Sequence, residues 1–139
     1  RTVRSLLVSL GLFSESITEV VIIGENSRPF SDGQLEALES ADLKLRISDD
    51  LCKELPDLDV VYINTIAWVG DDYEELGSQY GLNPSSPLKE DAIILHPLAR
   101  GRELPREFDD TPYNWNFAQA RGAVFMRMAL LSSIMKSFT

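Results

Sequence analysis

The sequence predicts an α/β fold of three layers, in which a mostly parallel, Rossmann-like sheet is flanked by helices. Short apolar segments closed by turn residues alternate along the chain with segments whose apolar residues recur at helical spacing. A helix that connects two strands favours parallel pairing, because the crossover returns the chain to the same end of the sheet. The 139 residues, 44% of them hydrophobic, are enough for a single domain with one core.

Four short apolar segments are predicted to be strands: residues 19–24, 43–48, 59–64 and 92–96. The first, EVVIIG, is rich in β-branched residues, which is typical of a strand buried on both faces. Ligands of parallel sheets bind at the carboxyl ends of the strands. The segments in which we expect a site are therefore residues 24–30, 48–50, 64–70 and 96–102.

Four segments with helical spacing of apolar residues are predicted to be helices: residues 2–12, 34–41, 48–55 and 117–138. Residues 71–81 are expected to form a short acidic helix or a loop. Gly122 lies inside the last helix, where glycine costs about 1 kcal/mol relative to alanine. It therefore marks either a close packing point or the true start of the regular helix.

The charge balance limits the partners. With 22 acidic and 13 basic residues the formal charge is −9, which disfavours nucleic acid and membrane surfaces. No apolar run approaches the roughly 20 residues of a spanning helix, so a cytoplasmic protein is expected. Cys52 is the single cysteine, which excludes an internal disulfide and suits a reducing compartment. With one histidine and one cysteine, neither a metal nor a cofactor is expected.

Two of the expected strand ends carry weak signals. Gly24 is followed by ENSRPF, which lacks the glycine spacing of a dinucleotide-binding loop. Asp49 and Asp50 lie where an acid could bind a ribose, but they fit helix caps better.

The last strand end carries the densest set of usable groups, in the stretch AIILHPLARG: His96, Arg100 and Arg102. The two arginines could bind a small anion. His96 is either part of such a site or a histidine whose hydrogen bonds are satisfied at a strand end. Pro97 leaves neighbouring carbonyl groups free of strand pairing, so they can be directed at a donor.

Four stretches resemble the second, amino-acid-binding domain of the aspartate carbamoyltransferase family: RTVRSLL (1–7), HPLAR (96–100), DDTPYNWNFAQA (109–120) and GAVFMRMALL (122–131). They occur in order along essentially the whole chain. The ornithine carbamoyltransferases share the fold and a related motif, but RTVRSLL and DDTPYNWNFAQA are more similar to the aspartate enzymes.

This resemblance implies a reaction that moves a carbamoyl group from carbamoyl phosphate to the amine of aspartate, in pyrimidine synthesis. In the family a first domain holds carbamoyl phosphate through a Ser-Thr-Arg-Thr-Arg motif, which is absent from residues 1–139. The chain, which starts without methionine and is expected to be a fragment or a processed piece, thus supplies at most half of an active site. We expect it to be inactive alone, to need a carbamoyl-phosphate-binding domain or partner chain, and to form a homo-oligomer.

The resemblance also assigns roles to four residues. Arg1 and Thr2 match a pair whose arginine binds a carboxylate of aspartate, which suits a bidentate guanidinium. Pro97 and Leu98 match the backbone whose carbonyl groups face the carbamoyl group and the incoming amine.

The chain departs from the family pattern at three positions: Thr65, Ala67 and Ala99. Thr65 and Ala67 replace an arginine and a glutamine that hold aspartate, and losing one charge-assisted pair costs about 1.5–3 kcal/mol. Aspartate, or an analogue, should therefore bind weakly. Ala99 replaces a proline that follows a cis peptide bond, and a cis bond before other residues costs roughly 2.5–4 kcal/mol. We expect a trans bond with redirected carbonyl groups, or else a strained cis bond that some function maintains.

A family strand that precedes the RT motif is missing from the chain. The remaining strands would face each other across the gap, and either close up or accept a strand from another molecule. Three functions follow from these observations: the aspartate-binding half of an active carbamoyltransferase, a non-catalytic homologue, or a carbamoyltransferase for another amine. The three departures favour the second as a description of present activity.

Overall fold

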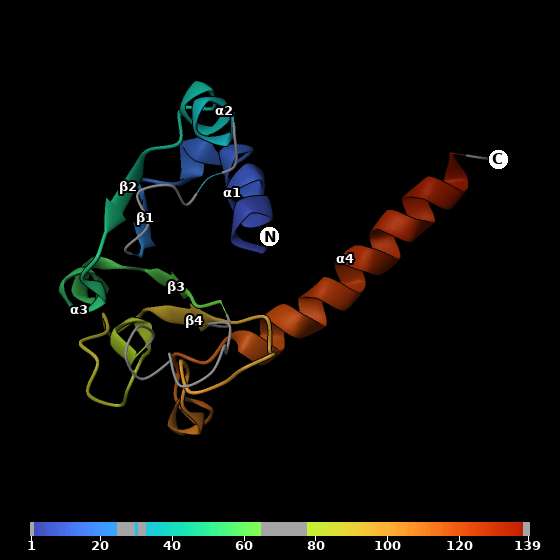
Figure 1. The fold of residues 1–139 in the computed structure, drawn as a ribbon. Coiled ribbons are helices and arrows are strands. Elements are labelled where there is room, and N and C mark those ends of the chain that lie inside the picture. The colour runs from blue at the N-terminus through green and yellow to red at the C-terminus, as the bar shows by residue number, and fades with distance from the viewer. Residues whose placement is uncertain (1, 25–29, 31–32, 65–77, 138–139) are drawn as a thin grey trace, which may run out of the picture. The chain divides into compact units, whose positions relative to one another are not determined.

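Helices alternate with parallel strands in the computed structural model, which describes residues 2–24, 30, 33–64 and 78–137 (Figure 1). The helices are α1 (Thr2–Gly11), α2 (Gln34–Ser40), α3 (Leu51–Glu54) and α4 (Asn116–Lys136). The strands are β1 (Val20–Ile23), β2 (Leu45–Ser48), β3 (Val60–Tyr62) and β4 (Ile93–Leu95). The predicted α/β class is confirmed, and each predicted helix and strand is present. Residues 71–77 lie outside the described part, and Ser78–Tyr80 forms a 3-10 turn.

The strands form two parallel pairs. Strand β1 pairs with β2 from Val20↔Leu45 to Ile23↔Ser48. Strand β3 pairs with β4 from Val60↔Ile93 to Tyr62↔Leu95. Within the described residues neither β1 nor β2 pairs with β3 or β4. The chain divides accordingly into two compact units, Arg1–Glu54 and Leu55–Thr139, and each is described by itself.

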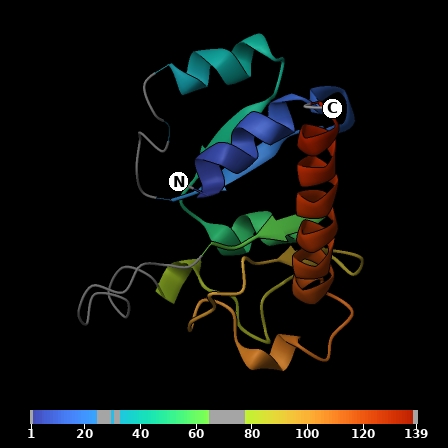
Figure 2. The same ribbon diagram turned by 90° about the vertical axis from the view of Figure 1, so that its right-hand side faces the viewer.

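In the first unit, α1 and α2 cover the β1–β2 sheet (Figure 2). The core is formed by Leu7 of α1, Leu38 of α2 and Leu43, which are each at most 3% exposed. Val8, the next residue of α1, is 57% exposed, so the helix has one buried face and one open face, as its apolar spacing predicts.

An ion pair network joins β2 to α3. Arg46 donates to both carboxylate oxygens of Glu54, each at 2.8 Å, and to Oε2 of Glu19 at 3.1 Å. These hydrogen bonds from Arg46, with one from Ser48, lower the pKa of Glu54 to about 2. The carboxylate of a short helix thus fixes the end of the strand that precedes it.

In the second unit, the segment around Asn114 extends the β3–β4 sheet. The N–H of Ile94 donates to the carbonyl of Tyr113 at 2.7 Å, and the N–H of Trp115 donates to the carbonyl of Ile94 at 3.1 Å. Ile94 is fully buried, since this parallel bridge covers the edge of β4 that faces away from β3. The sequence motif DDTPYNWN therefore lies directly beside the strand that carries the candidate site.

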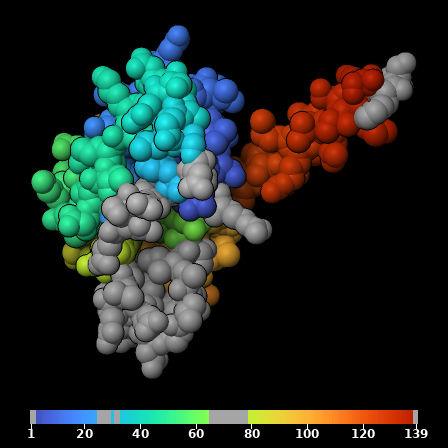
Figure 3. Space-filling model, turned by 45° about the horizontal axis from the view of Figure 1, so that its top comes forward, coloured from blue at the N-terminus to red at the C-terminus, as the bar shows by residue number. Residues whose placement is uncertain are grey.

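Helix α4, the orange to red segment in Figure 3, differs from α1 and α2 because most of its apolar side chains are exposed. Eight of them are more than 50% exposed: Phe117, Val124, Phe125, Met126, Met128, Leu130, Leu131 and Met135. The helix continues through Gly122, and a Cβ built there would meet nothing within 4 Å. Both expectations for Gly122 are therefore wrong for the described residues: it marks neither a close packing point nor a helix start. No described helix is long and apolar enough to cross a membrane.

Candidate functional site

The chain makes a tight turn directly after β4, at residues 96–101, which we call the β4 turn. Leu98 has a φ of 74°, in the left-handed region. This conformation costs a residue with a side chain about 1–2 kcal/mol. The Leu98–Ala99 peptide bond is trans, as the first of the two expectations for Ala99 states, while the redirection of the carbonyl groups stays a prediction. Pro97, Leu98 and Ala99 all lie at the surface.

His96 is buried beneath this turn, with 1% of its surface exposed. Its ring Nδ1 accepts a hydrogen bond from the N–H of Leu98 at 3.0 Å, and its Nε2 lies 3.1 Å from Oε1 of Glu103. The backbone N–H of His96 donates to the side-chain carbonyl of Gln119, on α4, at 3.0 Å. Every polar group of His96 except its carbonyl is thus engaged. The interpretation of His96 as a satisfied histidine at a strand end agrees with this geometry.

Glu103 contacts the β4 turn on its buried side and is itself fully buried. Its Oε1 accepts a second hydrogen bond, from the N–H of Gly101 at 2.7 Å, and its backbone carbonyl accepts one from Leu82 at 2.9 Å. Burial lowers the pKa of His96, and the opposing effect of Glu103 is smaller. The ring is therefore neutral near pH 7, with its proton on Nε2, because Nδ1 faces a donor.

Arg100 makes a bidentate ion pair within the same unit. Its Nη1 and Nη2 donate to Oδ1 and Oδ2 of Asp109 at 2.5 and 2.8 Å. The hydrogen bond from Arg100 lowers the pKa of Asp109. The backbone carbonyl of Asp109 in turn accepts a hydrogen bond from Asn114 at 2.9 Å. Arg100 therefore holds the turn against the DDTPYNWN segment, and an anion-binding role for Arg100 or for the exposed Arg102 stays a prediction.

The remaining predicted residues are not on this turn. Arg1, Thr65 and Ala67 lie outside the described residues, as do the side chain of Thr2 and most of residues 24–30 and 64–70. Thr2 begins α1, in the first unit. Among the residues that the structure describes, the predicted ones found close together are those that follow β4.

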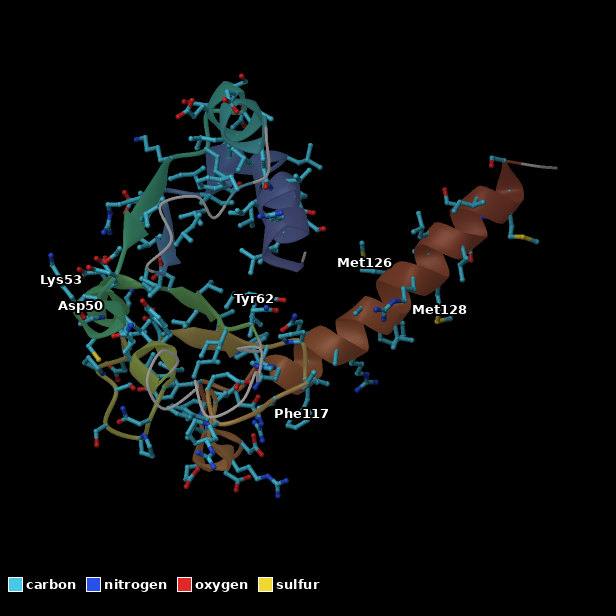
Figure 4. The ribbon with its side chains drawn as sticks, viewed as in Figure 1. Asp50, Lys53, Tyr62, Phe117, Met126 and Met128 are labelled. Atoms are coloured by element: carbon cyan, nitrogen blue, oxygen red, sulfur yellow. The ribbon has the colours of Figure 1, made fainter. Side chains whose placement is uncertain are left out.

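Two other expectations concern the end of β2 and metal binding. Oδ1 of Asp50 accepts a hydrogen bond from the N–H of Lys53 at 3.0 Å, so Asp50 caps α3, as interpreted from the sequence (Figure 4). Within residues 2–24, 33–64 and 78–137, no three potential metal ligands of the His, Cys, Asp and Glu types lie close together.

Three residues of the site were missed from the sequence: Glu103, Asp109 and Gln119. Glu103 lies in a charged stretch, GRELPRE, that is typical of a solvated loop. Asp109 and Gln119 belong to the motif DDTPYNWNFAQA, and that motif was the available signal. It places both residues near the β4 turn because it runs beside β4.

Comparison with known proteins identifies the family that the chain matches and the share of its relatives' length that the chain covers. Residues 1–134 match the model of the Asp/Orn binding domain of aspartate/ornithine carbamoyltransferase. The chain is 34% identical over 142 residues to the aspartate carbamoyltransferase catalytic subunit of Alkaliphilus oremlandii, covering 97% of the chain and 42% of that relative.

Two solved structures are similar in fold. The catalytic subunit of M. jannaschii aspartate transcarbamoylase matches with a TM-score of 0.84 and 26% identity, over 99% of this chain and 46% of that one. Aspartate transcarbamoylase from Trypanosoma cruzi, in complex with carbamoyl aspartate and phosphate, matches with a TM-score of 0.80 and 26% identity, over 94% and 44%. The chain thus spans less than half the length of each of these proteins.

Proposed function

The chain belongs to the aspartate/ornithine carbamoyltransferase family, and from this premise we propose that it forms the amino-acid-binding half of a carbamoyltransferase active site. The observation that carries the proposal is the match of residues 1–134 to the Asp/Orn binding domain alone. The relative from Alkaliphilus oremlandii is more than twice as long, which leaves room for a separate carbamoyl-phosphate-binding domain. The reaction so supported is carbamoyl transfer to the amine of aspartate, a step of pyrimidine synthesis.

The β4 turn would contribute through its backbone. Pro97 and Leu98 lie at the surface at the carboxyl end of β4, where ligands of parallel sheets bind. Their carbonyl oxygens can accept hydrogen bonds from an amine or from the amide group of a carbamoyl moiety. Because the buried ring of His96 lies under the turn, these carbonyl groups, rather than the imidazole, are the groups available to a ligand.

The exposed face of α4 supports the need for a partner. Met126 and Met128 point away from the helix on different sides (Figure 4), and both are more than 50% exposed. An apolar surface of this kind is unusual on a helix that works alone in water. We propose that α4 docks on the carbamoyl-phosphate-binding domain, on the same or another chain, and that the assembled protein is a homo-oligomer.

A test of this function starts from the 139-residue chain alone. With carbamoyl phosphate and aspartate supplied, no carbamoyl aspartate should form above the blank. Adding a carbamoyl-phosphate-binding domain that contains an intact Ser-Thr-Arg-Thr-Arg motif should restore product formation. Product from the isolated chain would contradict the proposed division of the active site between two domains.

A second candidate, a non-catalytic homologue, is favoured by Thr65, Ala67 and Ala99. The three positions carry different residues in the active family, and the loss of charge-assisted contacts weakens aspartate binding. Calorimetric titration with aspartate should give a dissociation constant no tighter than about millimolar, since two lost charge-assisted contacts, at about 1.5–3 kcal/mol each, amount to the roughly 4 kcal/mol that separates a millimolar from a micromolar site. A micromolar value would exclude this candidate.

A third candidate is carbamoyl transfer to another amine. Activity of the two-domain assembly distinguishes it from the other two candidates. If the two-domain assembly forms no carbamoyl aspartate, other primary amines should be offered with carbamoyl phosphate, and phosphate release followed. Release with one of them would identify an altered carbamoyltransferase. Release with none would leave the non-catalytic homologue as the function.

A further inference from the structure

We propose that His96 is a positioning residue, whose ring sets the direction of the Pro97 carbonyl without touching the ligand. The inference rests on the proposed function, because it concerns a carbonyl group that the β4 turn offers to the ligand. It goes beyond that function in assigning a task to the single histidine of the chain.

The first step is the geometry of one peptide group. The N–H of Leu98 and the carbonyl of Pro97 belong to the same planar trans peptide, in which the two bonds point in opposite directions. The N–H donates to Nδ1 of His96 at 3.0 Å. Because the ring is buried and Pro97 is at the surface, the Pro97 carbonyl is directed away from the interior.

The second step is that the ring itself is held in place. Nε2 donates to Oε1 of Glu103 at 3.1 Å, and the same oxygen is tied to the turn by the N–H of Gly101 at 2.7 Å. The N–H of His96 is also bound, to Gln119 at 3.0 Å. Ring, carboxylate and turn are thus joined through Oε1 of Glu103, while Oε2 of the same carboxylate has no partner within the described residues.

The third step is that only one form of the ring fits. Nδ1 must lack a proton to accept from Leu98, and Nε2 must carry one to donate to Glu103. In the other neutral tautomer, Nδ1–H would face the N–H of Leu98, so two donors would oppose each other. Nε2 would then carry no proton and could not donate to Glu103. The doubly protonated ring would make the same clash with the N–H of Leu98.

The ring has no direct route to a ligand. Its side chain and that of Glu103 are both 0% exposed. A general acid or base must lie within hydrogen-bond reach of the proton that it transfers. His96 therefore acts through the backbone, which is a different task from proton transfer.

The test begins with the unmodified 139-residue chain. Because the chain contains one histidine, ¹⁵N labelling of histidine gives one pair of ring signals that needs no assignment by mutation. We expect a neutral ring near pH 7 with the proton on Nε2. A proton on Nδ1, a protonated ring, or rapid exchange between tautomers would overturn the proposal.

A matched pair of variants tests the role of Nδ1. His96→Asn keeps an acceptor near the position of Nδ1 and loses the donor to Glu103, whereas His96→Gln keeps a donor near Nε2 and loses the acceptor. Hydrogen exchange of the Leu98 amide should be roughly fivefold or more faster in His96→Gln than in His96→Asn, as expected for one hydrogen bond. Equal exchange, or faster exchange in His96→Asn, would contradict a positioning role. If neither variant folds, the tautomer in the unmodified chain still decides the proposal.

A ligand experiment separates this inference from the proposed function. Aspartate with carbamoyl phosphate, added to the unmodified chain together with the carbamoyl-phosphate-binding domain, should shift the ¹³C signal of the Pro97 carbonyl. No shift at Pro97, together with the expected tautomer and exchange rates, would reject the proposed function and limit His96 to holding the turn. A shift that persists unchanged in His96→Gln would overturn the positioning role and leave the proposed function intact.

Discussion

The β4 turn buries polar groups, whereas helix α4 of the same unit exposes apolar ones. In the turn, His96 and Glu103 lie below 2% exposure, and Oε1 of Glu103 is hydrogen-bonded to His96 and Gly101, while its Oε2 has no partner within the described residues. In α4, Leu131 is 62% exposed and Met135 is 70% exposed. Each arrangement is costly by itself in water, but the turn offsets its cost within the chain and α4 does not. The comparison indicates a turn whose buried groups are mostly paired within the chain and a helix whose apolar face is not covered by the described residues.

The largest expected difference between the two regions is in the cost of removing a leucine side chain. Leu104, which follows Glu103, is 1% exposed, and Leu104→Ala should lower the free energy of unfolding by about 2–5 kcal/mol. Leu131→Ala, the matched change on α4, should alter it by less than about 0.5 kcal/mol in the isolated chain. Urea unfolding of both variants measures the difference. Equal losses would mean that α4 is buried in solution.

The next effect concerns the carboxylate of the turn. Glu103→Ala leaves the Nε2–H of His96 and the N–H of Gly101 without their acceptor, which should cost about 3 kcal/mol of stability. Glu103→Gln keeps one acceptor oxygen and should lose less. Glu107→Ala removes an exposed carboxylate nearby and serves as the control, with a change within about 0.5 kcal/mol. A loss in Glu107→Ala equal to that in Glu103→Ala would show that burial of Glu103 is not what matters.

A smaller effect is the response of the turn to acid. The pKa of His96 is lowered from 6.5 by burial, so the unfolded chain binds a proton at a higher pH than the folded chain. Stability should therefore be full above pH 6.5 and fall as the pH drops from 6.5 toward the lowered value.

Unfolding measured between pH 7 and pH 5, beside the His96→Asn variant, checks this response. The variant should lack the slope in this window. A second decline, at lower pH, belongs to Glu54 of the first unit, whose pKa is lowered to about 2 by Arg46, and to Asp109, whose pKa is lowered by Arg100, and it should persist in the variant. An identical slope in both proteins between pH 7 and pH 5 would exclude His96 as its source.

The sequence was sufficient for the fold because periodicity and strand composition are local properties. The four helices and the four strands lie where the apolar spacing predicts them. The site was only partly predictable, because burial of a charged residue depends on distant contacts. Glu103 is buried by its contacts with His96 and with the backbone of Leu82, and no local pattern indicates either one.

For both Arg100 and α4, the local sequence does not indicate which group is the partner. Arg100 was a candidate for anion binding because it lies in a local basic cluster with Arg102, but Asp109 reaches it from the following motif. The apolar spacing of α4 predicts a helix with a buried face, yet its apolar side chains are exposed in the described structure. A hydrophobic pattern predicts that a surface will be covered and leaves open which molecule covers it.

The smallest effect should appear at Gly122. Substitution there should raise the free energy of unfolding if α4 is exposed in the isolated chain and lower it if α4 is already packed. A Cβ at this position meets nothing within 4 Å, so Gly122→Ala should raise the free energy of unfolding of the isolated chain by up to about 1 kcal/mol through helix propensity. Gly33→Ala is the control, because Gly33 has a φ of 72° and the change should instead destabilise by about 1–2 kcal/mol.

The same variant also reports on docking. If the carbamoyl-phosphate-binding domain packs closely on α4 at Gly122, the added methyl group should weaken that association while it stabilises the free chain. Affinity measured by calorimetry between the two parts, beside the unfolding data, separates the two effects. A gain in stability with unchanged affinity would place the docking surface on another part of α4. A loss of stability in the isolated chain would instead mean that α4 is already packed at Gly122, and the contrast between the β4 turn and α4 would no longer hold.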